Sequence, residues 1–266
     1  MKDTKKDISV IYEDKDILAI NKPSGTIVHS DGKTKEYTVA DWILKTYPAL
    51  RNVGESFALP DGLVVPKPGI VHRLDRDTSG VLLIAKNQKT FLFLKQQFQE
   101  REVKKTYRAF VYGIIKEDRG VIDKPIGKSR KDFRQWSAER TARGMLREAV
   151  TEYKVLSRFP SQTSRHSASN SLGSGGVSYV EIYPKTGRTH QIRVHFKAIG
   201  YPVVCDRLYA PKRECALGFE RVALHAFGVE FLSPAGVRMN LEVSLPDDFK
   251  KALHILNQQS GDPVAK

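Results

Sequence analysis

Cysteines, long apolar runs and metal-ligand spacings are scarce in this sequence. Cys205 and Cys215 are its only cysteines. A disulfide-stapled secreted fold would carry more of them, so we expect two thiols in a reducing compartment. No apolar run comes near the roughly 18 to 20 residues that a membrane-crossing helix needs, and no cysteine and histidine cluster has the spacing of a zinc site. These absences exclude an integral membrane protein and argue against a metal centre.

The N-terminal segment, MKDTKKDISV, is charged and lacks the apolar stretch of a signal peptide, so we expect a cytoplasmic protein. Hydrophobic residues make up 40% of the 266 residues and aromatic residues make up 9%. This composition excludes a disordered or collagen-like chain, and the length is sufficient to bury a substantial core.

Positive charge is in excess. Lysine and arginine total 44 against 30 aspartates and glutamates, which gives a formal net charge of +14. Such an excess favours a polyanionic partner, either nucleic acid or an anionic membrane surface. Residues 101–147 alone hold 14 basic and 6 acidic side chains, a net charge of +8. This local concentration favours a binding surface over charge that is spread for solubility.

The pattern of apolar and polar residues predicts many strands and few helices. The continuous apolar run 81–85 is typical of a strand buried on both faces. Asn87 is expected to cap a helix with Phe91, Leu94 and Phe98 on one face. This content predicts an α+β fold on a mixed, mostly antiparallel sheet. Further helices are expected over 38–47, 189–199 and 249–256, and further strands over 9–12, 17–20, 106–115, 151–156, 179–183, 222–224, 229–231 and 237–243.

Three segments are expected to lack regular structure. Residues 48–69 are rich in proline and glycine and predict a loop. Residues 124–147 show little periodicity, so the basic segment is interpreted as an extended, solvated arm. Serine, glycine and asparagine dominate residues 157–176, which predicts a flexible loop.

Two clusters of polar residues adjoin expected core elements. The first, GIVHRLDRDTSG at 69–80, precedes the buried strand. It is either a surface turn, in which Asp75 and Asp77 pair with nearby arginines, or a functional loop, because charges beside a core strand need partners. The second, PKTGRTHQIRVH at 184–195, opens a helix. It is either an anion site, because helix N-termini favour anions, or an ordinary exposed helix start.

Five motifs in order resemble the RluA family of pseudouridine synthases. HRLDRDTSG at 72–80 is similar to the family's signature around its catalytic aspartate, and NKPSG at 21–25 to its first motif. KTY at 105–107 resembles the family's lysine-x-tyrosine motif. TGRTHQIRVH at 186–195 resembles the family's third motif, and LHA at 224–226 resembles a later motif. An ordered match of five motifs along nearly the whole chain is very improbable by chance.

The resemblance implies a single catalytic domain over residues 8–257 with the pseudouridine synthase fold, and flexible tails at 1–7 and 258–266. Many relatives carry an N-terminal S4-type RNA-binding domain, which we expect to be absent because the catalytic pattern begins so early. Cys205 stands where the family more often has glycine, and the 157–176 loop is longer and more polar than usual. Neither departure touches the catalytic motifs.

The implied reaction isomerises uridine to pseudouridine within RNA. The bond between uracil N1 and ribose C1′ breaks, the base turns over, and C5 bonds to C1′. No atom is gained or lost, so no cofactor or metal is expected. Asp75 is the implied catalytic aspartate, acting either as a nucleophile on the sugar or as a base on C2′. Arg193 would keep Asp75 ionised, and Tyr107 would stack on uracil and assist removal of the C5 proton.

The remaining candidate site residues are expected to bind RNA. Leu224 would form part of the apolar wall against the base, and His72 and Arg73 precede Asp75 in the signature. Arg73 is a candidate either to fill the space that a flipped uridine leaves or to hold the phosphates. The basic segment is expected to clamp the RNA through Lys128, Arg130 and Arg134, with Phe133 and Trp136 interleaved.

The expected partner is therefore RNA, either transfer RNA or large-subunit ribosomal RNA, bound by a monomer. The alternative is a non-catalytic RNA-binding or chaperone protein on the same fold, which the intact Asp75, Tyr107 and Arg193 disfavour. A glycosidase or nucleosidase is disfavoured because the second acid is missing and because positive charge is in excess.

Overall fold

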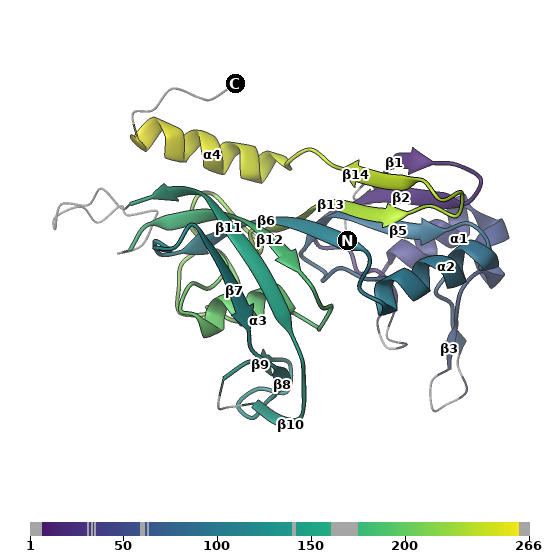
Figure 1. Cartoon of the computed structure of the whole chain (residues 1–266), viewed down its shortest axis with the longest axis horizontal. Helices are drawn as coiled ribbons and strands as arrows, with labels where there is room; N and C mark the ends of the chain where they lie inside the picture. The colour runs from purple at the N-terminus through teal and green to yellow at the C-terminus, as the bar shows by residue number, and fades with distance from the viewer. Residues whose placement is uncertain are drawn as a thin grey trace. The chain divides into compact units, whose positions relative to one another are not determined.

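The computed structural model describes residues 7–30, 32, 34, 36–58, 62, 64–139, 142–160 and 175–260, and its chain divides into two compact units (Figure 1). Unit 1 comprises residues 1–105 and 226–243, and unit 2 comprises residues 106–225 and 244–266. Most of both expected tails and of the expected 157–176 loop lies outside the described residues. Within the described ranges, no helix is long and apolar enough to cross a membrane.

Unit 1 is built on strands in the order β1-β2-β5-β13, with β14 paired to β13, and the pairs β1–β2, β2–β5 and β13–β14 are antiparallel. All seven residues of β5 are buried, as the continuous apolar run predicted. The unit 1 core joins Ile17 and Ala19 of β2 to Val81 and Leu83 of β5, with Phe231 of β13 in the same cluster. The strand bounds are β1 Ser9–Glu13, β2 Ile17–Lys22, β5 Ser79–Ala85, β13 Leu224–Leu232 and β14 Arg238–Glu242.

Two helices of unit 1 begin where capping residues predicted them. The side chain of Asn87 accepts a hydrogen bond from the backbone N–H of Thr90 at 2.9 Å and starts α2 (Gln88–Gln99). Thr38 and Asp41 form a capping box at the start of α1 (Val39–Thr46). The expected loop over 48–69 is partly wrong, because it contains a 3₁₀ helix and a short hairpin. These elements are η1 Pro48–Asn52, β3 Phe57–Ala58 and β4 Val64–Val65.

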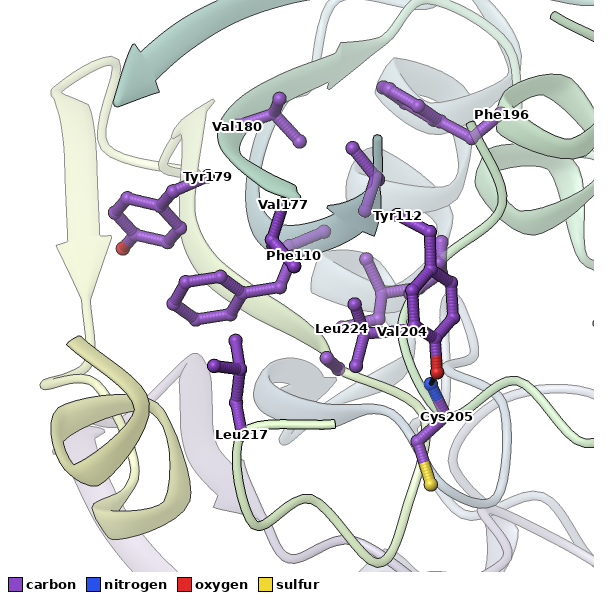
Figure 2. Packing of buried hydrophobic residues seen from close by; sticks show 14 of the residues in the cluster. Phe110, Tyr112, Val177, Tyr179, Val180, Phe196, Val204, Cys205, Leu217 and Leu224 are labelled. Atoms are coloured by element: carbon purple, nitrogen blue, oxygen red, sulfur yellow. Dashed lines mark hydrogen bonds between the residues drawn. The ribbon is translucent and has the colours of Figure 1, made fainter. Parts of the chain in front are cut away.

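Unit 2 contains a second run of antiparallel strands, in the order β6-β12-β11-β7. Figure 2 shows its core, where Phe110 of β6 stacks on Tyr179 of β12 at 4.7 Å between ring centroids. The closing helix α4 (Asp247–Ser260) adds Phe249 to the same core, and α3 (Gln191–Ala198) adds Phe196. The strand bounds are β6 Lys104–Tyr112, β7 Arg119–Asp123, β11 Val150–Phe159 and β12 Val177–Pro184.

The basic segment is not an irregular arm, so that prediction was wrong. It forms a three-stranded antiparallel sheet, β10-β8-β9, which lies beyond the ends of β7 and β11 in Figure 1. Ile126 and Trp136 anchor this sheet to a small apolar cluster that includes Tyr209. The strands are too short for a clear period of two, which is why the sequence pattern did not reveal them. Their bounds are β8 Ile126–Ser129, β9 Trp136–Ser137 and β10 Ala142–Arg147.

The two cysteines form a disulfide, so the expectation of two reduced thiols was also wrong. Cys205 and Cys215 are ten residues apart, and their Cα atoms are separated by 4.4 Å. Tyr112 contacts the backbone near both cysteines. Its hydroxyl accepts a hydrogen bond from the backbone N–H of Cys205 at 3.2 Å (Figure 2) and donates one to the backbone oxygen of Glu214. One core tyrosine therefore holds both ends of the loop that the disulfide closes.

Candidate active site

Asp75 lies in a tight loop directly before β5 in unit 1. The backbone N–H of Thr78 donates to the backbone oxygen of Asp75 at 3.2 Å, which closes a turn. Leu74 is buried, Asp75 is half-buried, and Arg73 is exposed. The buried Leu74 thus fixes the chain to the core while the next side chain, the carboxylate of Asp75, reaches the surface of the unit.

A fully buried lysine anchors this loop from the NKPSG motif. Lys22 has no exposed surface, and its ammonium donates to the backbone oxygens of Pro23, Thr26 and Arg76 at 2.9, 2.8 and 2.9 Å. The backbone N–H of Gly25 donates to the same Arg76 oxygen at 2.9 Å. A buried ammonium needs such acceptors to offset its desolvation. The first motif therefore fixes the backbone immediately after Asp75.

Gly80 closes the loop against a neighbouring strand. Its φ is +120°, and a Cβ at this position would lie 2.1 Å from the backbone oxygen of Ala226 in β13. No side chain fits there, because real Cβ atoms do not approach a backbone oxygen so closely. The signature therefore needs glycine at this position for packing, independently of any chemistry.

His72 supports the same loop from its N-terminal side. Its Nε2 accepts a hydrogen bond from the backbone N–H of Leu83 at 2.9 Å, and its ring stacks on Phe98 with 4.7 Å between centroids. Burial, together with the charge of Lys105, lowers the pKa of His72 to about 3, so the ring is neutral at physiological pH. Burial also lowers the pKa of Lys105 to about 8. The structure gives His72 a scaffold contact, and its predicted contact with RNA stays a prediction.

The surface-turn interpretation of the signature accounts for only part of the loop. Arg76 forms a bidentate ion pair with Glu36, with nitrogen to oxygen distances of 2.7 and 2.9 Å. Arg76 is therefore paired with a residue of another segment, Glu36. The side chain of Ser24 donates to the backbone oxygen of Asp77 at 3.0 Å, which ties this residue to the first motif.

In unit 2, Arg193 is held by an acid that the sequence analysis did not single out. Its Nε and Nη2 donate to Asp206 at 2.7 and 2.8 Å, and Asp206 is 1% exposed. Asp206 also accepts from the backbone N–H groups of Leu208 and Tyr209 at 3.1 and 3.0 Å. The predicted pairing of Arg193 with Asp75 stays a prediction, whereas its pairing with Asp206 is part of the structure.

The start of α3 is a framework of side-chain hydrogen bonds. Gln191 donates from Nε2 to the backbone oxygen of Val150 at 3.0 Å and accepts at Oε1 from the hydroxyl of Thr186 at 2.7 Å. The backbone N–H of Arg188 donates to the same Oε1 at 3.0 Å. The helix begins at Gln191, two residues later than predicted. These contacts set the direction of α3, and with it the position of Arg193 in the first turn of the helix.

Tyr107 and Leu224 are the remaining predicted site residues of unit 2, which includes the first two residues of β13. Tyr107 lies in β6 and packs, partly buried, against the core of this unit. Leu224 is 3% exposed at the first position of β13. Arg221 donates to the backbone oxygen of Leu224 at 3.1 Å and is itself paired with Asp248 at 2.7 Å. The position of Leu224 is therefore fixed by a charged residue that the sequence analysis did not single out.

The predicted RNA-clamp residues lie on and around the small three-stranded sheet. The ammonium of Lys128 lies 4.3 Å from the centroid of the Trp136 ring, a cation–π distance. Arg134 pairs with Asp132 at 2.7 Å, and Arg130 is exposed. Phe133, at the turn between β8 and β9, is 79% exposed. This surface combines cations with aromatic faces, which suits unstacked bases and phosphates.

The structure places the predicted residues in both units. His72, Arg73 and Asp75 belong to unit 1, and Tyr107, Arg193 and Leu224 to unit 2. In the part of the chain that the structure describes, no group of three or more histidine, cysteine, aspartate or glutamate side chains is arranged to hold a metal ion.

Comparisons with known proteins agree in pointing to one family. Residues 16–198 match the family model described as RNA pseudouridylate synthase. An RNA pseudouridine synthase of Aquifex aeolicus is 35% identical over 260 residues, covering 95% of this chain and 74% of that protein. Ribosomal large subunit pseudouridine synthase D of Pseudomonas aeruginosa is 34% identical over 264 residues, covering 95% and 72%. The solved structure of human RNA pseudouridylate synthase domain containing 1 is similar with a TM-score of 0.67 at 28% identity, covering 92% and 85%.

Proposed function

Because the chain belongs to the RNA pseudouridylate synthase family, it is an RNA-modifying isomerase, and we propose that Asp75 performs its chemistry on uridines of large-subunit ribosomal RNA. The family membership confirms the RluA-type resemblance and the α+β pseudouridine synthase fold. The choice of ribosomal RNA over transfer RNA is supported by relatives that are named large subunit pseudouridine synthases. The observation that carries the proposal is the Asp75 loop, which Lys22 holds rigidly.

In the proposed reaction, the carboxylate of Asp75 starts the cleavage of the bond between uracil N1 and ribose C1′. It either attacks C1′ or removes a proton from C2′, and both routes detach the uracil. The detached base turns so that C5 faces C1′, and a bond forms between these carbons. In the first route this bond displaces the Asp75 carboxylate from C1′, and in the second route C2′ regains the proton that Asp75 removed. C5 then loses its proton and N1 gains one, so the product has the same composition as the substrate.

Arg193 and Tyr107 are proposed to assist Asp75. A guanidinium near the carboxylate favours its ionised form, and the bidentate contact with Asp206 fixes the direction of the Arg193 side chain. Tyr107 offers a ring for stacking on uracil and a hydroxyl for removing the C5 proton. Leu224 supplies an apolar contact for the base. Arg73 is proposed either to occupy the space vacated when the uridine flips out of its stack, a step that costs a few kcal/mol, or to hold the phosphates of the RNA strand.

The three-stranded sheet is proposed to grip the RNA outside the reacting nucleotide. Its exposed cations contact phosphates, and the exposed Phe133 stacks on an unpaired base. Replacing Lys128, Arg130, Lys131 and Arg134 together by alanine is expected to weaken RNA binding and to lower its dependence on salt, because each phosphate contact releases counterions. Binding measured at several salt concentrations tests this grip, and an unchanged affinity and salt slope would contradict it.

The decisive experiment for the function is to incubate the protein with ribosomal and transfer RNA transcripts and to map pseudouridines. We expect modification of ribosomal RNA by the wild type and none by Asp75→Ala. Wild type that binds RNA but forms no pseudouridine in any transcript would favour the non-catalytic RNA-binding alternative. An Asp75→Ala variant with full activity would refute the assignment of the catalytic residue.

A further inference from the structure

An open cavity of about 400 Å³ lies in unit 1 against the loop that leads to Asp75. Its volume is within the range of small-molecule sites. Apart from Arg73, the reaction proposed for Asp75 uses none of its side chains. The cavity is lined by His29, Glu55, Ser56, Lys67, Ile70, Val71, His72, Arg73, Phe91 and Lys95.

The lining of this cavity is positively charged. Lys67, Arg73 and Lys95 contribute three cations against the single carboxylate of Glu55, which is ion-paired with Lys95. His72 adds no charge at neutral pH, because its pKa is about 3. Burial and the nearby charge of Arg73 lower the pKa of Lys67, and the carboxylate of Glu55 acts in the opposite direction. The cations of Lys67 and Arg73 therefore influence each other in a partly desolvated place. An anionic group between them would stabilise both.

Regular elements hold the cavity in shape. Ile70 forms a β-bridge with Ile84 of β5, and Phe91 of α2 is 3% exposed. Lys95 lies one turn further along the same helix. Gly69 has a φ of +63°, and a Cβ there would lie 2.1 Å from a backbone oxygen of β5, so the segment entering the cavity packs tightly on the sheet. Regular elements therefore form the wall of the cavity, and the cations of Lys67 and Arg73 lie in the loop segments that border it.

We propose that this cavity binds one nucleotide of the substrate RNA next to the target uridine, with its phosphate at Lys67 and Arg73 and its sugar against Ile70 and Val71. This inference rests on the proposed function of Asp75. Arg73 precedes Asp75 by two residues, which is at most about 7 Å of extended chain. An RNA strand whose uridine reaches Asp75 therefore passes Arg73, and the adjoining phosphate meets the cationic end of the cavity.

The test measures RNA binding in an Asp75→Ala background, so that turnover does not disturb the affinity. Adding Lys67→Ala is expected to weaken binding about tenfold, and to lower the slope of log affinity against log salt by about one. The matched control is Lys89→Ala, which removes the same charge from an exposed position on α2 outside the cavity lining. Lys67→Arg keeps the charge and is expected to restore most of the affinity. Thermal unfolding of each variant verifies that it is folded.

A second arm separates an RNA nucleotide from a free small anion, which offers the same phosphate chemistry. Uridine 5′-monophosphate and inorganic phosphate are titrated while methyl resonances of Ile70 and Val71 are followed by NMR. We expect weak, millimolar binding of the nucleotide at this cavity. Binding of either free compound as tight as RNA binding would overturn the assignment to RNA.

The outcomes for RNA affinity are equally distinct. Equal effects of Lys67→Ala and Lys89→Ala would overturn the cavity as a nucleotide site. A loss of RNA affinity in Lys67→Ala but not in Lys89→Ala supports the cavity as a nucleotide site, even if the wild type forms no pseudouridine. A wild type that forms no pseudouridine would refute only the proposed chemistry, because the binding measurement does not depend on turnover.

Discussion

Replacing Asp206 by asparagine is expected to destabilise the protein and to slow pseudouridine formation. The side chains of Arg193 and Asp206 are 11% and 0% exposed, and two hydrogen bonds of 2.7 and 2.8 Å join them. In Asp206→Asn the amide nitrogen takes the place of either Oδ2 or Oδ1. At Oδ2 it faces Nε of Arg193, and at Oδ1 it faces Nη2 of Arg193 and the backbone N–H groups of Leu208 and Tyr209. Each orientation loses the counter-charge and sets a donor against a donor.

The expected loss in the free energy of unfolding is about 3 to 5 kcal/mol, the usual cost of removing one partner from a buried ion pair. Asp206 does not touch the substrate in the proposed reaction, so it acts by positioning Arg193. A displaced guanidinium is expected to lower kcat by about 10- to 100-fold, with a smaller change in KM. Urea unfolding measures the first quantity, and pseudouridine formation at saturating RNA measures the second.

A double-mutant cycle with Arg193→Met makes the prediction specific to the pair. The Asp206→Asn variant buries the Arg193 guanidinium without a counter-charge, whereas the double variant has no guanidinium at this position. We therefore expect the double variant to be more stable than Asp206→Asn alone. Two results would refute the reasoning. One is an Asp206→Asn variant that keeps wild-type stability and kcat, and the other is strict additivity of the two single changes.

Three further predictions concern the scaffold. Reducing the disulfide between Cys205 and Cys215, which closes a loop of ten residues, is expected to lower the free energy of unfolding by about 3 kcal/mol; equal thermal unfolding with and without reductant would contradict this. Gly80→Ala is expected to cost more than about 3 kcal/mol, because its Cβ would lie 2.1 Å from a backbone oxygen, and a wild-type urea midpoint would refute it. The folded-state pKa of His72 is about 3 against 6.5 for the free side chain, so the unfolded state binds more protons between these values and stability falls as pH drops from about 6.5 towards 3. Urea midpoints across this range should fall less steeply in His72→Gln, and an identical pH dependence would count against the assignment.

Local patterns predicted several elements because the residues that determine them are close in sequence. Five successive apolar residues predicted the strand β5. Asn87 and the spacing of Phe91 and Leu94 predicted the helix α2. The signature loop was placed correctly before β5. What the sequence did not reveal is that Lys22, some fifty residues away, holds this loop.

The features that were missed depend on contacts between distant residues. Ile126 and Trp136 fold the basic segment into a sheet by packing beside Tyr209, which no local pattern encodes. Likewise, the disulfide depends on a return of the chain that Tyr112 stabilises from another strand. Asp206 lies outside the regular elements, 13 residues beyond Arg193, so no helical or strand spacing linked the two.

The complete burial of Lys22 makes this residue a natural reporter on the Asp75 loop. An amine-acylating reagent reacts with the uncharged amine of accessible lysines, and the ammonium of Lys22, which has no exposed surface, is out of reach while its three carbonyl partners are in place. Labelling at this position therefore requires the loop to open. Time-resolved acylation followed by mass spectrometry would give the opening rate of the loop, with and without RNA, and without any engineered probe.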